Sequence, residues 1–289
     1  MTLSEFLRPF EFEFFRNGLA VATIAGALCG MIGVYVVLRG MSYIGHGLSH
    51  AIFGGFAASA LIGVNVFVGA GIWGLASALM ISRVTRRRSI GSDAAIGVIT
   101  TASFALGLAL IQVFGSPGRN PDAVLFGNVL GVSRGDVWMV IGVTIFAAAV
   151  IFLQYRPLLF STFDPEVAAA SGVKTARMDA LLMLVLALSI LATMNVMGVT
   201  LIAAGVVIPA VVARLLTNSF ARMLPLATII GAFCGFTGMI GSYHLDIASG
   251  PTIVLTGAVL FTSVYALTAR NRTRSPASPD TRAGSLSPV

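Results

Sequence analysis

Residues 17–38 read NGLAVATIAGALCGMIGVYVVL, a stretch that contains no charged side chain. A helix that crosses the hydrocarbon of a membrane needs about 20 mostly apolar residues, so this stretch predicts a transmembrane helix. The rest of the chain has the same character, since 57% of its 289 residues are hydrophobic and only 10% are charged. Soluble domains carry about 25% charged residues. We therefore expect an all-α integral membrane protein, a polytopic bundle rather than a set of soluble domains.

Apolar runs separated by Gly, Pro, Asn and Ser predict the number of crossings. The runs are 17–38, 46–62, 64–82, 93–113, 136–154, 178–197, 199–216, 222–243 and 251–269. Runs 46–62 and 199–216 are short, so one of them is a candidate for a re-entrant segment, and eight and nine transmembrane helices both remain open. Residues 1–269 form one predicted transmembrane domain. Residues 270–289 are rich in Ser, Pro and Arg and predict a disordered tail.

Arginine and lysine predict the orientation, because cytoplasmic loops carry an excess of these residues. If the loop at 83–93 is cytoplasmic, the other side holds only four of the 18: Arg8, Arg16, Arg119 and Arg134. The loop at 155–177 and the C-terminus are therefore expected in the cytoplasm, with the chain in the cell (inner) membrane. The N-terminus lies outside with nine crossings and inside with eight. The net charge of +7 then reflects topology and contact with membrane lipid, and no nucleic acid partner is expected.

Two glycine-rich segments resemble each other, GALCGMIG at 26–33 and GAFCGFTG at 231–238. Each contains glycines four residues apart, a spacing that lets membrane helices approach closely. The predicted topology runs the first segment inward and the second outward, as in an inverted repeat. Segments of such simple composition also match by chance, so a true repeat and a coincidence both remain open.

Polar side chains within membrane spans are costly, so they mark candidate sites. His46 and His50, in MSYIGHGLSHA at 41–51, lie four residues apart and thus on one face of a helix. Neutral imidazoles bind divalent transition metals, which predicts a metal translocation site at this pair. The alternative is that both rings bond only to backbone carbonyls. His244 and Asp246 are expected at the outer mouth, either as a first contact for a cation or as ordinary loop residues.

Single residues exclude the enzyme classes that use similar motifs. A zinc protease helix needs Glu directly after its first histidine, and position 47 is Gly. An ATP-binding P-loop needs Gly-Lys-Ser/Thr, whereas the only lysine, Lys174, lies in SGVKTA. We therefore expect a transport subunit rather than an enzyme. It should have no permanently bound cofactor, and any ATP should bind to a separate partner chain.

The cytoplasmic segment FSTFDPEVAAASGVKTARMDA at 160–180 predicts a short helix. Asp164 suits the N-cap, Pro165 the first helical position and Glu166 the first turn. Gly172 suits the end of the helix. A helix of this kind on the cytoplasmic face favours a docking element for a partner, and the alternative is an ordinary connecting loop.

Several separated motifs resemble, in the same order, the membrane-spanning permease subunits of ABC importers for manganese, zinc and iron, the ABC-3 family. They are LRGMSYIGHGLSHAIFGG (38–55), SDAAIGV (92–98), LFGNVLGVS (125–133), FDPEVAAASGV (163–173), VIPAVVARLL (207–216) and SYHLDIASGPTIVL (242–255). The resemblance implies an ABC importer fold and a homodimer of this chain. It also implies two cytoplasmic ABC ATPase subunits as partners, and an extracytoplasmic metal-binding protein that delivers the ion.

The resemblance also implies residue roles. His46 and His50 match the family's metal-contacting pair, and residues 164–172 match its coupling helix, which is seated in the ATPase. The family commonly has Asp at the position of His46, and an imidazole there should favour zinc or iron over manganese. The alternative function is a secondary metal-ion transporter or channel without an ATPase, which needs ion-coupling acids deep within spans. None of the 11 acids lies deep within a predicted run.

Overall fold

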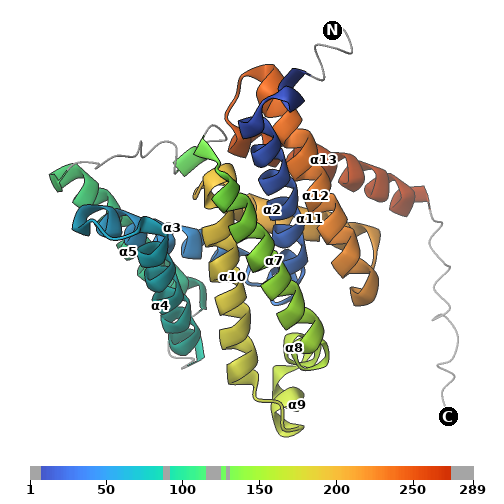
Figure 1. Cartoon of the computed structure of the whole chain (residues 1–289). Helices are drawn as coiled ribbons and strands as arrows, with labels where there is room; N and C mark the ends of the chain where they lie inside the picture. The colour runs from blue at the N-terminus through green and yellow to red at the C-terminus, as the bar shows by residue number, and fades with distance from the viewer. Residues whose placement is uncertain (1–7, 87–91, 115–124, 128–130, 275–289) are drawn as a thin grey trace, which may run out of the picture.

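The computed structural model describes residues 8–86, 92–114, 125–127 and 131–274 (Figure 1). Within these ranges the chain is helical apart from turns and has no strand, which confirms the all-α prediction. Each predicted apolar run falls on a separate helix. The elements are η1 (Arg8–Glu11), α2 (Glu13–Leu38), α3 (Ser42–Ile62), α4 (Val66–Arg86), α5 (Ser92–Phe114), α7 (Arg134–Leu153), α8 (Tyr155–Phe163), α9 (Pro165–Ala170), α10 (Thr175–Met197), α11 (Ile202–Leu216), α12 (Phe220–Leu245) and α13 (Ser249–Arg274).

Helix length and hydropathy separate seven clear membrane spans from two weaker ones in the described part of the chain. The seven are α2, α4, α5, α7, α10, α12 and α13. Helix α3 has 21 residues, but it carries His46 and His50, which lower its hydropathy. Helix α11 is apolar but has only 15 residues. These two helices contain the two runs that the sequence marked as short.

Helix α13 continues to Arg274, past the expected domain boundary at residue 269. Most of the tail expected at 270–289 lies outside the described residues.

Helices α2 and α10 form the centre of the bundle, and 72% of the apolar window of each is buried. Helix α2 contacts α7, α10, α11 and α12, and Figure 1 shows it between them. By contrast, only 22% of the apolar window of α7 and 17% of that of α13 are buried, although both helices are strongly apolar. Apolar side chains that remain exposed over such helices indicate contact with lipid.

Helices α3, α4 and α5 pack on one another and form a second group at one side of α10 (Figure 1). This group is joined to the centre through contacts of α4 with α10 and of α3 with α10 and α11. The helix with the two histidines therefore packs on α4 and α5 and also contacts α10 and α11.

Helices α2 and α12 pack antiparallel and in very close contact. The rings of Phe15 and Tyr243 lie 5.3 Å apart at one end of the pair, and those of Tyr35 and Phe220 lie 5.4 Å apart at the other. Helix α2 therefore begins where α12 ends. Aromatic pairs close both ends of this interface.

Glycines allow the backbones of α2 and α12 to touch between these ends. A Cβ atom added to Gly26 would lie 2.1 Å from the carbonyl oxygen of Gly231, and one added to Gly231 would lie 2.0 Å from that of Gly26. Gly30 meets Ala227 in the same way, and Gly235 meets Ala22. The two similar glycine-rich segments thus pack reciprocally against each other. An inverted repeat of the whole fold stays a prediction.

We predict that Gly231→Ala forces α2 and α12 apart, because its methyl group would overlap the carbonyl of Gly26. The free energy of unfolding should fall by about 1–3 kcal/mol, as for other overpacked interiors. Thermal unfolding of the purified protein in detergent measures this loss. Gly142→Ala on α7 is the control, since nothing lies within 4 Å of its added carbon. Equal melting temperatures for the two variants would contradict a tight interface.

Candidate functional site

A glycine turn sets the direction of the helix that carries His46 and His50. Gly40, between α2 and α3, has a positive φ of 66°, a conformation that favours glycine. The Gly40 and Met41 amides donate to the carbonyls of Val37 and Val36, at 3.2 and 3.0 Å. This pattern ends α2 and lets the chain reverse at once into α3. The site is therefore fixed directly to the end of the central helix.

The rings of His46 and His50 lie together on one face of α3, as the sequence predicts. Their centroids are 4.4 Å apart, and both rings are half-buried. The ring of His50 also packs edge-on against Phe104 of α5, at 4.3 Å. Two imidazoles at this separation can approach a single ion from one side.

The Nε2 atom of His50 is buried and makes no hydrogen bond. Buried polar atoms almost always have a partner, so an unpaired ring nitrogen needs an explanation. The alternative in which both rings bond only to backbone carbonyls does not hold for this nitrogen. The nearby hydroxyl of Ser49 donates to the carbonyl of His46, at 2.8 Å, and so bonds to the backbone. An imidazole nitrogen without a hydrogen-bond partner fits a ligand for a passing metal ion.

Close packing of α5 against α3 holds the histidine pair in place. A Cβ atom on Gly47 would lie 2.7 Å from Ile96, and one on Gly54 would lie 2.3 Å from the carbonyl of Ser103. The hydroxyl of Thr100, which also borders Gly47, donates to the carbonyl of Ile96 in its own helix, at 2.7 Å. Helix α5 therefore contributes packing and the Phe104 ring here.

One chain supplies only part of a coordination shell. No group of three or more His, Cys, Asp and Glu side chains that could hold a metal ion occurs among the described residues. Transition metals in proteins take four or more donors. The two imidazoles therefore need further donors from water or from a second copy of the chain.

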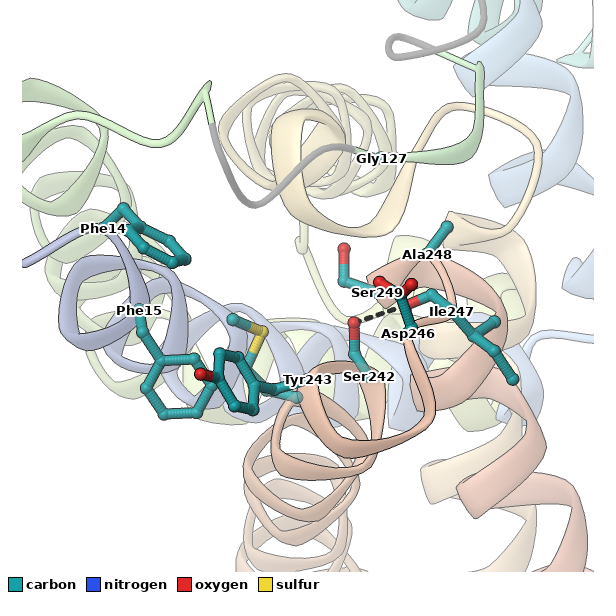
Figure 2. A pocket seen from close by; sticks show the side chains of 10 residues that line it. Phe14, Phe15, Gly127, Ser242, Tyr243, Asp246, Ile247, Ala248 and Ser249 are labelled. Carbon is teal, nitrogen blue, oxygen red and sulfur yellow. Dashed lines mark hydrogen bonds between the residues drawn. The ribbon is translucent and has the colours of Figure 1, made fainter. Parts of the chain in front are cut away.

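The expected outer-mouth residues lie at the end of α12, and one of them, Asp246, lines an open hollow of about 560 Å³. Figure 2 shows that Asp246 lines this hollow, opposite the rings of Phe15 and Tyr243. Asp246 ends α12 with a positive φ of 54°, and Ser242 donates to the carbonyl of Ile247, at 2.6 Å. His244 is not among the lining residues. The hollow thus has the carboxylate of Asp246 but not the imidazole of the expected pair.

The segment 164–172 folds as the sequence predicts. Asp164 caps α9 by accepting a hydrogen bond from the amide of Val167, at 2.9 Å, and Pro165 is the first helical residue. Glu166 is exposed in the first turn. Gly172 follows the helix with a positive φ of 86°. The short helix is confirmed, while its role as a coupling helix stays a prediction.

Sequence reasoning missed one polar cluster near α9. Arg39, at the end of α2, forms an ion pair with Asp179 of α10, at 2.6 Å. It also donates to the hydroxyls of Ser161 and Thr162 in α8, at 3.0 and 3.1 Å. An arginine at the inner end of an apolar run suggests only a topology signal. The four residues are called the Arg39 cluster below.

Known proteins are similar to this chain over most of its length. Residues 11–268 match the model of the ABC 3 transport family. The chain is 39% identical over 255 residues to the manganese transport system membrane protein MntC of Halalkalibacterium halodurans, covering 88% of this chain and 87% of that protein. It is 38% identical over 262 residues to the manganese import system permease protein ScaB of Streptococcus parasanguinis, covering 91% and 93%.

A solved structure has a similar fold. A chain of PsaBC from Streptococcus pneumoniae in complex with Fab superposes with a TM-score of 0.82 and 34% identity, covering 91% of this chain and 95% of that one. The family match, the curated relatives and the shared fold agree over nearly the whole bundle. The chain belongs to the ABC 3 transport family.

Proposed function

We propose that this chain is the permease subunit of an ATP-binding-cassette importer that moves a divalent transition metal ion across the cell membrane. The observation that carries the proposal is the His46–His50 pair on α3, with a buried Nε2 atom that has no hydrogen-bond partner. The family supports this reading over a secondary transporter or a channel. Among the acids whose side chains the structure describes, only Asp136 and Asp179 are buried or half-buried, and both lie near helix ends and have partners, which gives no support to an ion-coupling acid.

The working unit is a homodimer in which each copy contributes one histidine pair to a shared pathway. Two chains supply four imidazoles, which is enough for a transition metal without a resident cofactor. An extracytoplasmic binding protein delivers the ion to the outer end, where Asp246 lines the open hollow. ATP binds to separate cytoplasmic ATPase subunits, which contact α9. ATP binding and hydrolysis there alternate the access to the histidines between outside and inside.

The proposed topology has nine crossings within residues 1–269, with the N-terminus outside and the tail in the cytoplasm. The ends of the helices support it, because Glu13 of α2 pairs with Arg134 of α7 at 2.6 Å, on the side where α12 ends. Arg39 contacts α8 and the start of α10 at the opposite side. Helices α3 and α11 then count as crossings, although they are the weakest spans.

His46 decides which metal this importer prefers, because imidazole suits zinc and iron whereas manganese is best bound by oxygen. The relatives named for manganese therefore do not fix the substrate of this chain. We propose that it carries zinc or iron in preference to manganese.

His50→Ala removes the unpaired buried nitrogen and should abolish metal uptake. The loss should exceed about tenfold, the effect that even an outer-shell partner of a metal site can have. Uptake of isotopic zinc, iron and manganese into cells that lack the native importer measures it, and membrane insertion and ATPase association should stay normal. Thr144→Ala is the control, since that hydroxyl bonds only within α7. Normal uptake by the His50 variant would remove the histidine pair from the mechanism.

His46→Asp should shift the preference of the importer toward manganese. A carboxylate oxygen replaces an imidazole at the same position, which changes donor type while a metal ligand is retained. Competition between isotopic manganese and unlabelled zinc measures the ratio of the two uptake rates. The ratio should rise in the variant. An unchanged ratio would show that His46 does not select the metal.

Glu166→Lys should weaken docking of the ATPase, because it reverses an exposed charge in the first turn of α9. Co-purification of the ATPase with the tagged permease should fall by several-fold, as expected when an interface charge is reversed. Glu11→Lys makes the same charge change on an exposed residue at the other end of the bundle and should have no effect. Equal recovery of the ATPase with both variants would count against α9 as the docking helix.

A further inference from the structure

The Arg39 cluster gathers three helices around one buried guanidinium. The side chain of Arg39 is only 8% exposed, and its three nitrogens each have a different acceptor. Nη1 donates to Asp179 at 2.6 Å, Nη2 to Ser161 at 3.0 Å, and Nε to Thr162 at 3.1 Å. The two hydroxyls in turn donate to the carbonyl of Leu158, which orients their lone pairs toward the arginine. The guanidinium is thus held from three directions.

The Arg39 cluster lies between α3, which carries His46 and His50, and α9, the expected coupling helix. Arg39 directly precedes the Gly40 turn into α3, and His46 follows within the next two helical turns. Ser161 and Thr162 directly precede the α9 segment. The cluster therefore touches the two parts of the chain that must move together if hydrolysis is to drive transport.

A small cavity lies between the beginning of α3 and the beginning of α9. Its volume is about 250 Å³. Met41 and Ile44 from the beginning of α3 line it, together with Pro165 of α9 and with Arg39 and Asp179 of the cluster. The first turn of α3 and the first residue of α9 thus share one space. Arg39 and its three acceptors also line this space.

Stability alone does not explain a buried arginine that pairs with a half-buried carboxylate at this place. The cost of removing charges from water often equals or exceeds their attraction, so an apolar pair is commonly as stable. A guanidinium with several fixed acceptors instead defines one relative position of the groups that it joins. Such an arginine is useful where one helix must move together with another.

We propose that Arg39 is a positioning residue that transmits the movement of α9 to α3 and so to the two histidines. This inference rests on the proposed function, because it assumes that an ATPase moves α9. When α9 shifts, α8 and the start of α10 carry Ser161, Thr162 and Asp179 with them. The guanidinium follows these acceptors and pulls the end of α2 and the start of α3. Without it, ATP is hydrolysed while the histidines stay where they are.

The experiment uses the complete importer, permease, ATPase and binding protein together, in lipid vesicles. Arg39→Gln and Asp179→Asn should each bind the ATPase and hydrolyse ATP near the wild-type rate. Metal uptake per ATP hydrolysed should fall by about tenfold or more, within the range of known coupling effects between sites. The double variant should be no worse than either single variant, because the two residues act as one unit. Arg39→Lys keeps the charge but loses the planar fork and should give an intermediate ratio.

A second ion pair in the chain offers a matched control. Arg134 and Glu13 are also 2.6 Å apart, but their side chains are 77% and 55% exposed and lie at the opposite end of α2. Arg134→Gln should leave uptake per ATP unchanged. If Arg134→Gln lowers this ratio as much as Arg39→Gln does, the transmitting role is overturned. It is also overturned if the Arg39 and Asp179 variants lower uptake and hydrolysis in the same proportion.

Thr162→Val covers the case in which Arg39→Gln does not assemble. It removes one acceptor and leaves the ion pair, so the protein should fold and show a smaller fall in uptake per ATP. A wild-type ratio in both Thr162→Val and Asp179→Asn would overturn the inference.

Failure of the proposed function is a separate result. In that case the wild-type vesicles themselves take up no metal, whereas failure of the inference leaves wild-type uptake and the His50→Ala loss intact.

Discussion

The contact between the backbones of α2 and α12 is the interaction on which the bundle depends. In lipid no hydrophobic force draws apolar helices together, so association relies on close packing of atoms. At Gly26 and Gly231 the two main chains meet without any side chain between them. Helix α2 is held in this way at the centre, and its end at Arg39 fixes where α3 begins. The position of the two histidines on α3 therefore depends on the contact between α2 and α12.

Polar groups inside the described part of the bundle fall into two kinds, those with a hydrogen-bond partner and those without one. Most hydroxyls within the spans donate to a carbonyl one turn earlier, as Ser189 does to Val185, and so cost little. The guanidinium of Arg39 has three acceptors, one for each of its nitrogens. The buried Nε2 atom of His50 has no partner, and neither has the buried hydroxyl of Tyr35 on α2, but only the histidine ring lies beside a second imidazole. A ring nitrogen without a partner inside a membrane span fits a site that an ion occupies only briefly.

The sequence predicts those features that depend on local rules. The apolar runs follow from the thickness of the membrane, the histidine pair from the helical repeat, and α9 from the capping preferences of Asp164 and Pro165. Contacts between distant segments have no such local signal. Arg39 and Asp179 are 140 residues apart, and only the folded chain brings them together. The separation of His244 from the hollow that Asp246 lines likewise depends on how the end of α12 is packed.

The proposed half-site in each copy and the proposed positioning role of Arg39 fit one physical requirement of a pump. The ion must be bound firmly when access is from outside and weakly when access is to the inside. Bonds between transition metals and nitrogen are about 2.0–2.1 Å long and tolerate deviations of only about 0.2 Å. If the four imidazoles come from two chains, a small displacement of α3 in each copy breaks the shared coordination. Arg39, at the end of α2 and just before α3, is suited to produce such a displacement, because its three acceptors leave the side chain little freedom to move independently of them.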